Sequence, residues 1–248
     1  MTMPDAAMLA VIGVTFLLAG TVKGVIGLGL PTVSLGLLTA ALDLPTAMAL
    51  LLVPSLVTNV WQALAGTQTA SVARRIWPFL IMAGGCVWIG ALALTRADVR
   101  LLSALLGMLI FAYGSLSLAG VRLAIAPRHD AWAGPLIGAM NGVLTGMTGS
   151  FVVPGVMYLQ AIGLPRDSLV QAMGMLFTIS TLALGLALKG NNLLSLEHAT
   201  LSTAALVPAV AGMIAGQSIR KRLPEAVFRS VFFPPCWCSP RSRRARAG

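Results

Sequence analysis

Residues 20–31, GTVKGVIGLGLP, and residues 138–146, GAMNGVLTG, are two glycine-rich stretches inside strongly apolar parts of the chain. Glycines four residues apart let two helix backbones come into contact. Glycine with proline at membrane depth breaks a helix, which is tolerated only where protein or a water-filled cavity receives the freed backbone groups. A broken membrane helix that occurs twice in a chain points to the binding site of a transporter. We assign helix breaking and close packing to these positions: Gly20, Gly24, Gly27, Gly29, Pro31, Gly138, Gly142, Gly146, Gly149 and Pro154.

The composition indicates a protein that is embedded in a membrane. Hydrophobic residues make up 57% of the 248 residues and charged residues 10%, whereas about a quarter of the residues of a soluble domain are charged. The formal net charge of +10 does not indicate a nucleic-acid partner, because the basic residues lie between apolar runs, as determinants of membrane topology do. We therefore predict an all-α polytopic membrane protein of the cell (inner) membrane, with the lipid bilayer as a partner and no nucleic acid.

Charged and polar breaks divide the chain into apolar runs, of which about 20 residues are needed to cross a bilayer. The run from about residue 6 to 42 is too long for one span, so we expect helices at 6–25 and 31–42 on either side of the first break. A second broken run covers 132–162. The predicted total is about 7–8 transmembrane spans. The unbroken ones are expected at 44–64, 76–95, 99–119 and 166–188.

The second half of the sequence repeats the order of the first. Gly20 and Gly138 lie 118 residues apart, and Pro45 and Pro165, which open the following spans, lie 120 residues apart. Such a duplication predicts a transporter of two homologous helical repeats with broken or re-entrant glycine-rich helices. The expected layout is a first repeat at 1–120, a polar linker at 121–131, a second repeat at 132–232 with an incomplete last helix, and an atypical basic tail at 233–248.

The ends of the chain differ from the apolar runs between them. The opening MTMPDAAMLA has no basic segment, so we expect no cleaved signal peptide and a retained first span. After Phe233 the sequence becomes PPCWCSPRSRRARAG, which cannot form a last span and resembles a frameshifted or truncated end. Cys86, Cys236 and Cys238 form neither a zinc-like nor a disulfide framework. We expect no metal site and no cofactor.

Several of these features together resemble the TauE/SafE family. They are the duplicated glycine element, the short apolar run after it, the Leu-Pro pairs at 44–45 and 164–165, and the glycine-rich third helix. Members of this family are membrane carriers associated with the export of sulfite, organosulfonates and other small sulfur-containing or carboxylate anions. The resemblance covers residues from about 6 to 232. It implies an integral membrane transporter of such anions that works by alternating access at the interface between the repeats.

Lys23 is the basic residue of the first glycine stretch, and its counterpart at the 118-residue offset is Asn141. An ammonium group at the bilayer centre costs on the order of 3 kcal/mol, a cost that an anionic substrate would offset. The alternative is that Lys23 lies near a helix end and reaches the lipid headgroups. If the two stretches meet at the midplane, we expect Lys23 and Asn141 around one cavity, with Lys23 holding most of the charge of the anion.

Polar side chains in the spans are further candidates for binding the anion. Thr58, Asn59 and Gln62 lie close together on one helix, where each could donate hydrogen bonds to sulfonate or carboxylate oxygens. The alternative is bonding between helices, worth about 0.6 kcal/mol on average. Free N–H groups at helix starts near 30–34 and 150–153 would add positive dipole ends. The predicted substrate-binding residues are Lys23, Asn141, Asn59, Gln171 and Ser150.

An enzyme is not expected from this sequence. His129 and His198 lie in connecting segments, and the chain has no nucleophile-base motif, metal-binding motif or pair of carboxylates typical of a catalytic site. A membrane scaffold or assembly protein without transport is the alternative function, because glycine stretches can serve packing alone. The sequence leaves homo-oligomerisation, the exact substrate, the direction of transport and the coupling ion open.

The basic residues between spans also predict the orientation in the membrane. If each broken run is one crossing, Arg96, Arg100, Arg166 and Arg229 lie on the same side as the cluster at 220–222, which we expect to be cytoplasmic, with the N-terminus outside. The other side then carries Arg74, Arg75, Arg122, Arg128 and Lys189. If each short second segment crosses or re-enters instead, the two halves are inverted. The sequence alone does not choose between these arrangements.

Overall fold

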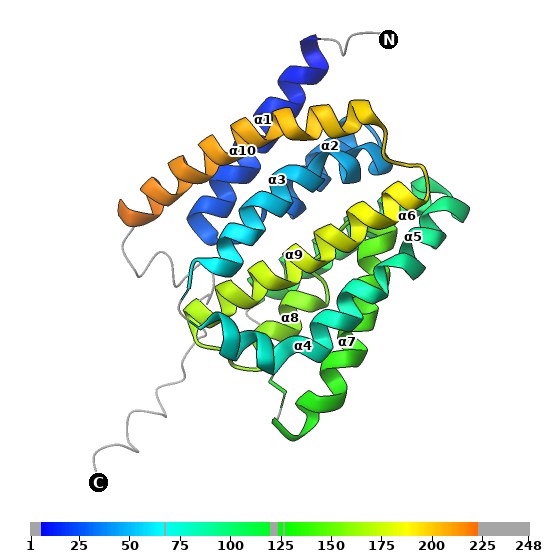
Figure 1. Ribbon diagram of the computed structural model, residues 1–248. Coiled ribbons are helices and arrows are strands. Elements are labelled where there is room, and N and C mark those ends of the chain that lie inside the picture. Colours follow the sequence, from blue (N-terminus) through cyan, green and yellow to red (C-terminus); the bar gives the residue numbers. More distant parts are fainter. Residues whose placement is uncertain (1–5, 67, 120–123, 126, 223–248) are drawn as a thin grey trace.

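A computed structural model describes residues 6–66, 68–119, 124–125 and 127–222, and within them all regular secondary structure is α-helical (Figure 1). The predicted all-α class is therefore confirmed. The predicted basic tail at 233–248 lies outside the described residues. In chain order the helices are α1 (Ala6–Ile26), α2 (Leu30–Ala41), α3 (Leu44–Leu64), α4 (Thr69–Gly85), α5 (Val87–Arg96), α6 (Val99–Leu118), α7 (Pro127–Thr148), α8 (Gly155–Ala161), α9 (Arg166–Gly190) and α10 (Leu196–Arg222).

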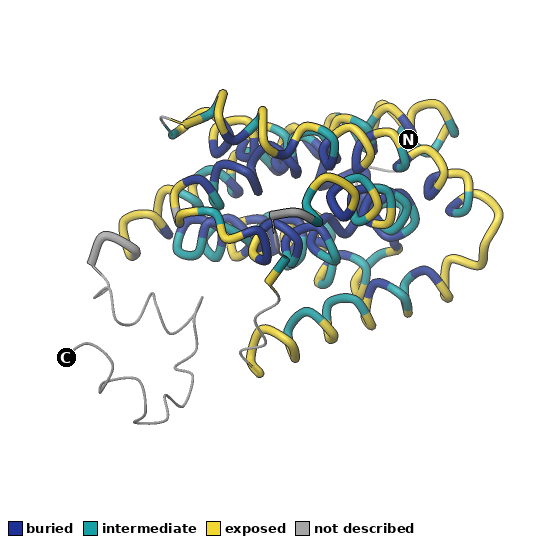
Figure 2. Tube along the Cα trace, turned by 90° about the horizontal axis from the view of Figure 1, so that it is seen from below, coloured by how far each residue is buried: buried dark blue, intermediate teal, exposed yellow. Residues whose placement is uncertain are grey.

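Six helical segments among the described residues are long and apolar enough to cross a membrane. They are Ala6–Ile26, Leu44–Leu64, Thr69–Arg96, Val99–Leu118, Asp167–Gly190 and Leu196–Ile219. Buried residues gather in the middle of the bundle and exposed ones on its outside (Figure 2). The outer side chains include large apolar groups such as Leu101, Phe111 and Val207, which suits contact with lipid rather than water. The predicted total of seven to eight spans, which counts the broken segments, stays a prediction.

The first glycine stretch separates α1 from α2. Gly27 and Gly29 have φ angles of 82° and 119°, a region of backbone conformation that glycine adopts without steric cost. Pro31 lies in the first turn of α2, where its missing N–H has no helical partner to lose. The second stretch ends in a similar way: α7 stops at Thr148, Gly149 has a φ of 72°, and the short α8 follows. A short helix therefore connects α1 to α3 and α7 to α9.

The glycines of the first stretch lie against α10. A Cβ atom added at Gly20 or Gly24 would come closer than 3.0 Å to the carbonyl oxygen of Ala209 or Met213. The contact is reciprocal, because a Cβ atom at Gly216 would overlap the carbonyl oxygen of α1 at Thr21 in the same way. The two helix backbones thus touch, as small residues permit in membranes. Because rising residue numbers in α1 meet rising numbers in α10, the two helices run in the same direction.

The glycines of the second stretch lie in the same manner against α4 and α5. Cβ atoms at Gly138 and Gly146 would overlap the carbonyl oxygens of Phe79 in α4 and Val87 in α5. Gly90 of α5 makes the reciprocal contact with α7. α7 therefore runs in the same direction as α4 and α5, and it packs on them as closely as α1 packs on α10.

α3 and α9 pack against each other and run in opposite directions. The side chain of Gln62 bonds to α9 at Val170, and near the opposite ends of the two helices Leu52 lies beside Gly185. α3 instead runs alongside α10 in the same direction, because Ser202 Oγ near the start of α10 donates to the Leu50 carbonyl oxygen at 2.8 Å. The long helices thus form two sets, in which α1, α3 and α10 run one way and α4–α5, α7 and α9 run the other way.

This arrangement defines two ends of the bundle. At one end, which we call the cavity end, Ser168 at the start of α9 donates to Gln68 Oε1 before α4 at 2.9 Å, and Gly24 meets the last turns of α10. At the opposite end, Gly190 in the last turn of α9 lies beside Trp88 of α5. The first and last turns of the described helices can therefore be assigned to one end or the other.

Within the part of the chain that the structure describes, the basic residues other than Lys23 are distributed unequally between the two ends. By position in the chain, the cavity end carries Arg74, Arg75, Arg128, Arg166, Arg220, Lys221 and Arg222, and the opposite end carries Arg96, Arg100 and Lys189. The predicted grouping of basic residues was therefore wrong in part, since Arg96 and Arg100 lie away from the cluster at 220–222. The prediction counted each broken run as one crossing of the membrane. In the structure α1 and α3 run in the same direction, so the chain returns through α2 between them.

Candidate functional site

Lys23 lies in the last turn of α1 and is 3% exposed. Its Nζ atom donates a hydrogen bond to Thr58 Oγ1 at 3.2 Å and another to Asn59 Oδ1, both in α3. Thr58 and Asn59 are themselves fully or almost fully buried. The ammonium group is therefore held inside the protein by two neutral oxygens.

The partners of Lys23 are fixed by further hydrogen bonds. Asn59 Nδ2 donates to Ser55 Oγ at 2.9 Å, and Ser55 Oγ lies 3.4 Å from Thr181 Oγ1 in α9. Thr58 Oγ1 donates to the Pro54 carbonyl oxygen at 2.7 Å, one turn earlier in α3, so its lone pairs are turned toward the ammonium. This polar chain links α1, α3 and α9 through the interior of the bundle.

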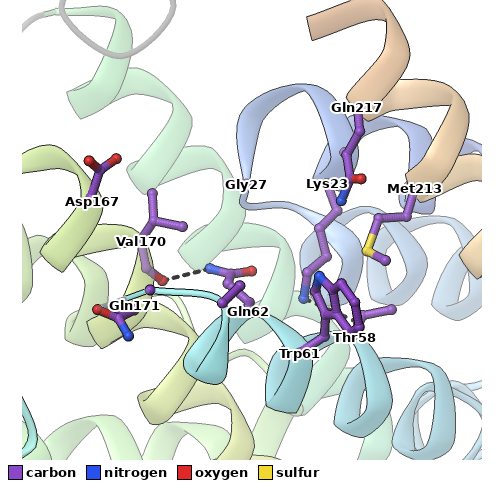
Figure 3. A pocket seen from close by; sticks show the side chains of 13 residues that line it. Lys23, Gly27, Thr58, Trp61, Gln62, Asp167, Val170, Gln171, Met213 and Gln217 are labelled. Carbon is purple, nitrogen blue, oxygen red and sulfur yellow. Dashed lines mark hydrogen bonds between the residues drawn. The ribbon is translucent and has the colours of Figure 1, made fainter. Parts of the chain in front are cut away.

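A cavity of about 360 Å³ lies beside Lys23 at the cavity end of the bundle (Figure 3). This is within the range of about 300–1,000 Å³ that is usual for small-molecule sites. Residues from α1, α3, α9 and α10 and from the α3–α4 connection line it: Lys23, Gly24, Gly27, Thr58, Trp61, Gln62, Ala65, Gly66, Asp167, Val170, Gln171, Met213 and Gln217. Four helices thus meet around one buried cation.

Two glutamines form part of the wall and tie α3 to α9. Gln62 Nε2 donates to the Val170 carbonyl oxygen at 2.8 Å. Gln171 Nε2 donates to the Ala63 carbonyl oxygen at 3.1 Å and to Thr69 Oγ1 at 2.7 Å. Both N–H groups of Gln171 are therefore used within the protein, although the residue lines the cavity as a predicted ligand would.

The remaining predicted ligands lie elsewhere. Asn141 is fully buried in α7, where its Oδ1 atom accepts a hydrogen bond from the backbone N–H of Gly155 at 2.9 Å and its Nδ2 atom has no partner among the described residues. Ser150 follows the same break, and its carbonyl oxygen accepts from Thr145 Oγ1 at 2.9 Å. Neither Asn141 nor Ser150 lines the cavity beside Lys23. The structure thus brings together Lys23, Asn59 and Gln171 but not these two residues.

Several residues of the cavity were not predicted from the sequence: Trp61, Ala65, Gly66, Asp167, Val170, Met213 and Gln217. Trp61 lies three positions after Thr58, on the same side of α3, and this spacing could have indicated it. Met213 and Gln217 follow Gly212 and Gly216 by one position each, so the glycine face of α10 could have indicated them once its contact with α1 was known. Among the described residues, His, Cys, Asp and Glu side chains form no group of three that could hold a metal ion.

The chain matches the model of a known protein family. The family model described as Sulfite exporter TauE/SafE matches residues 12–234, a range that includes α1 to α10 except the first turns of α1. No curated protein and no solved structure matches the chain.

Proposed function

Since the chain belongs to the sulfite exporter TauE/SafE family, we propose that it carries a small sulfur-containing or carboxylate anion across the membrane through the cavity beside Lys23. The observation that carries this proposal is the position of Lys23, a fully enclosed ammonium group on the wall of a cavity. An ammonium has three N–H donors, and Thr58 and Asn59 take two of them. The third is available to an anion in the cavity.

The cost of burying Lys23 favours a role in anion binding over a purely structural role. A lysine at membrane depth costs on the order of 3 kcal/mol, and two neutral hydrogen-bond acceptors recover only part of this cost. A sulfite, sulfonate or carboxylate group would neutralise the charge in an environment where water does not screen it. Asp167 also lines the cavity but is exposed. Solvent therefore screens its repulsion of an entering anion more strongly than it screens the attraction of the buried Lys23.

Alternating access would follow from two inverted repeats. In this proposal α1, α3 and α10 correspond to α7, α9 and α4–α5, and each pair runs in opposite directions. The packing supports the correspondence: Gly20 meets the residue after Pro208, and Gly138 meets the residue after Pro78. In a transporter with inverted repeats, each half can adopt the conformation of the other half. This swap converts the inward-open form into the outward-open form. Asn141, whose Nδ2 atom has no partner among the described residues, would then contact the anion from the second half in the other form of the transporter.

The unequal distribution of basic residues supports an orientation. Lysine and arginine near the ends of spans favour the cytoplasmic side, and the cavity end carries the larger basic set. We therefore assign the cavity end to the cytoplasm and the N-terminus to the outside of the cell (inner) membrane. A cavity that opens toward the cytoplasm suits the loading step of an exporter.

Anion flux from reconstituted vesicles tests the proposed function. Sulfite, ethanesulfonate and acetate would be loaded separately, with and without a pH gradient, to give both the preferred anion and any coupling to protons. Lys23→Met is expected to abolish the flux, and Lys189→Met, which removes an exposed lysine of α9 far from the cavity, is the matched control. If no anion moves faster than through empty vesicles, a non-transporting scaffold is the better assignment.

A further inference from the structure

A second, apolar hollow lies between α3 and α10. It has a volume of about 860 Å³, and we call it the α3–α10 groove. Its walls are formed mainly by Leu56, Val57, Val60 and Leu64 of α3 and by Val210 and Ile214 of α10. Val57 and Ile214 are 44% and 57% exposed. The groove is thus open to the surroundings of the protein and runs along two parallel helices.

The groove is continuous with the cavity beside Lys23. Thr58, Trp61, Ala65, Met213 and Gln217 border both spaces. In Figure 3 the Trp61 ring and the Met213 side chain lie next to Lys23. A ligand can therefore occupy both spaces at once, with no intervening helix to cross.

The two spaces have opposite chemical character. The cavity presents a buried ammonium and several side-chain amides, whereas the groove presents aliphatic side chains. From Val57 to Leu64 the groove extends along two turns of helix, or about 10 Å. A charged head and an apolar tail of this length would each meet a matching surface.

We propose that the site takes an amphiphilic organic anion, with its sulfonate or carboxylate at Lys23 and its alkyl chain in the α3–α10 groove. This inference rests on the proposed function and specifies the substrate class of the same site. The charge of Lys23 selects the anionic head, and the continuity of the two spaces directs the tail into the groove. A sulfite ion would use only the cavity and leave the groove without a ligand group.

A series of linear sulfonates tests this proposal. Ethanesulfonate, butanesulfonate, hexanesulfonate and octanesulfonate would compete with the flux of a labelled small anion from vesicles of phosphatidylcholine. The concentration for half inhibition is expected to fall about fourfold for each fully buried methylene, or about twofold for each one that is half covered. Empty vesicles measure leakage, and all proteins are compared in the same vesicles, so partitioning into lipid is common to them.

Filling the groove should remove this dependence on chain length. Val57→Trp places a large ring among the groove side chains and is expected to make octanesulfonate no better an inhibitor than ethanesulfonate, relative to the parent. Leu92→Trp makes the same kind of change at an exposed position of α5, outside both spaces, and should keep the dependence of the parent. Equal dependence in the parent and in Val57→Trp would overturn the groove assignment, while a flux that still requires Lys23 would leave the proposed function intact.

Two further measurements separate the remaining outcomes. Trp61 borders both spaces and is 65% exposed, so its fluorescence, isolated by subtracting a Trp61→Phe sample, should change with octanesulfonate at lower concentration than with ethanesulfonate. This readout supports or overturns the inference even if no flux is measured. Vesicles with added phosphatidylglycerol test a lipid as the occupant. If this lipid alone abolishes the chain-length dependence, the groove holds lipid and the inference is wrong.

Discussion

Gln62 of α3 and Gln171 of α9 form a reciprocal pair of hydrogen bonds between the two helices. Each side-chain amide donates to the backbone carbonyl oxygen of the residue next to the other glutamine. The acceptors are Val170 at 2.8 Å and Ala63 at 3.1 Å. This contact between α3 and α9 also forms part of the wall of the cavity. The two glutamines therefore connect the packing of the bundle to the shape of the binding site.

This reciprocal pair predicts coupled effects on stability. Gln62→Met and Gln171→Met are each expected to lower the midpoint of thermal unfolding in detergent, because each leaves a carbonyl oxygen without its side-chain donor. The double variant should lose about 1 kcal/mol less than the sum of the two single losses, since both bonds join the same two helices. Strictly additive losses would mean that the two bonds act independently.

Lys23→Arg is expected to lower the anion flux at least about tenfold, which corresponds to about 1.4 kcal/mol. The guanidinium is larger than an ammonium and planar, whereas Lys23 is enclosed by Thr58 and Asn59. The measurement is the initial rate of sulfite efflux from vesicles, normalised to inserted protein, with Lys189→Arg as control. If Lys23→Met transports as well as the parent, Lys23 is a structural residue, and backbone dipoles and neutral side chains must bind the anion.

Gly24→Ala is expected to destabilise the protein by about 1–3 kcal/mol, as overpacking does. The added Cβ atom would meet the carbonyl oxygen of Met213, which belongs to a helix backbone and cannot rotate away. Gly13→Ala changes the same helix at a position with no atom within 4 Å, and should be neutral or slightly stabilising, since alanine favours helix. Thermal unfolding in detergent compares the two. Equal midpoints would show that α1 and α10 can move apart without cost.

Labelling of single cysteines tests the orientation. In a chain with Cys86, Cys236 and Cys238 replaced by serine, a cysteine at Ser218, at the cavity end, should react only after the cells are permeabilised. A cysteine at Glu197, at the opposite end, should react in intact cells. Both positions are exposed, so accessibility to the reagent depends on the side of the membrane. Labelling of the Ser218 position in intact cells would reverse the orientation.

The sequence predicted the local features of the fold well. The apolar composition and run lengths predicted membrane helices, and glycine next to proline predicted the break that the structure has between Ile26 and Leu30. Lys23 lies in an apolar stretch with no acidic residue nearby in the sequence, and this was enough to nominate it. These features depend on a few neighbouring residues, whose conformational preferences and solvation costs are known in advance.

Features that depend on distant residues were not predicted. Gly20 and Gly24 indicated close packing, but nothing near them in the sequence named α10 as the partner. Without that partner, Met213 and Gln217 could not be placed beside Lys23. The grouping of basic residues failed for the same reason, because the path of the chain after each break depends on how the long helices pair. Asn141 was nominated from its offset, which gave no sign that its side chain lies away from the cavity beside Lys23 in this structure.

The pairing of α1 with α10 has a consequence for how the protein is made. α1 is the first described helix to leave the ribosome and α10 the last, so the face with Gly20 and Gly24 stays uncovered during almost the whole of synthesis. Lys23 receives Thr58 and Asn59 once α3 has entered the bilayer, but the backbone contact with Met213 must wait until α10 has been synthesised. Long-range closure of this kind is slow and leaves intermediates exposed. Until α10 is made, the glycine face of α1 therefore lacks the helix that covers it in the finished protein.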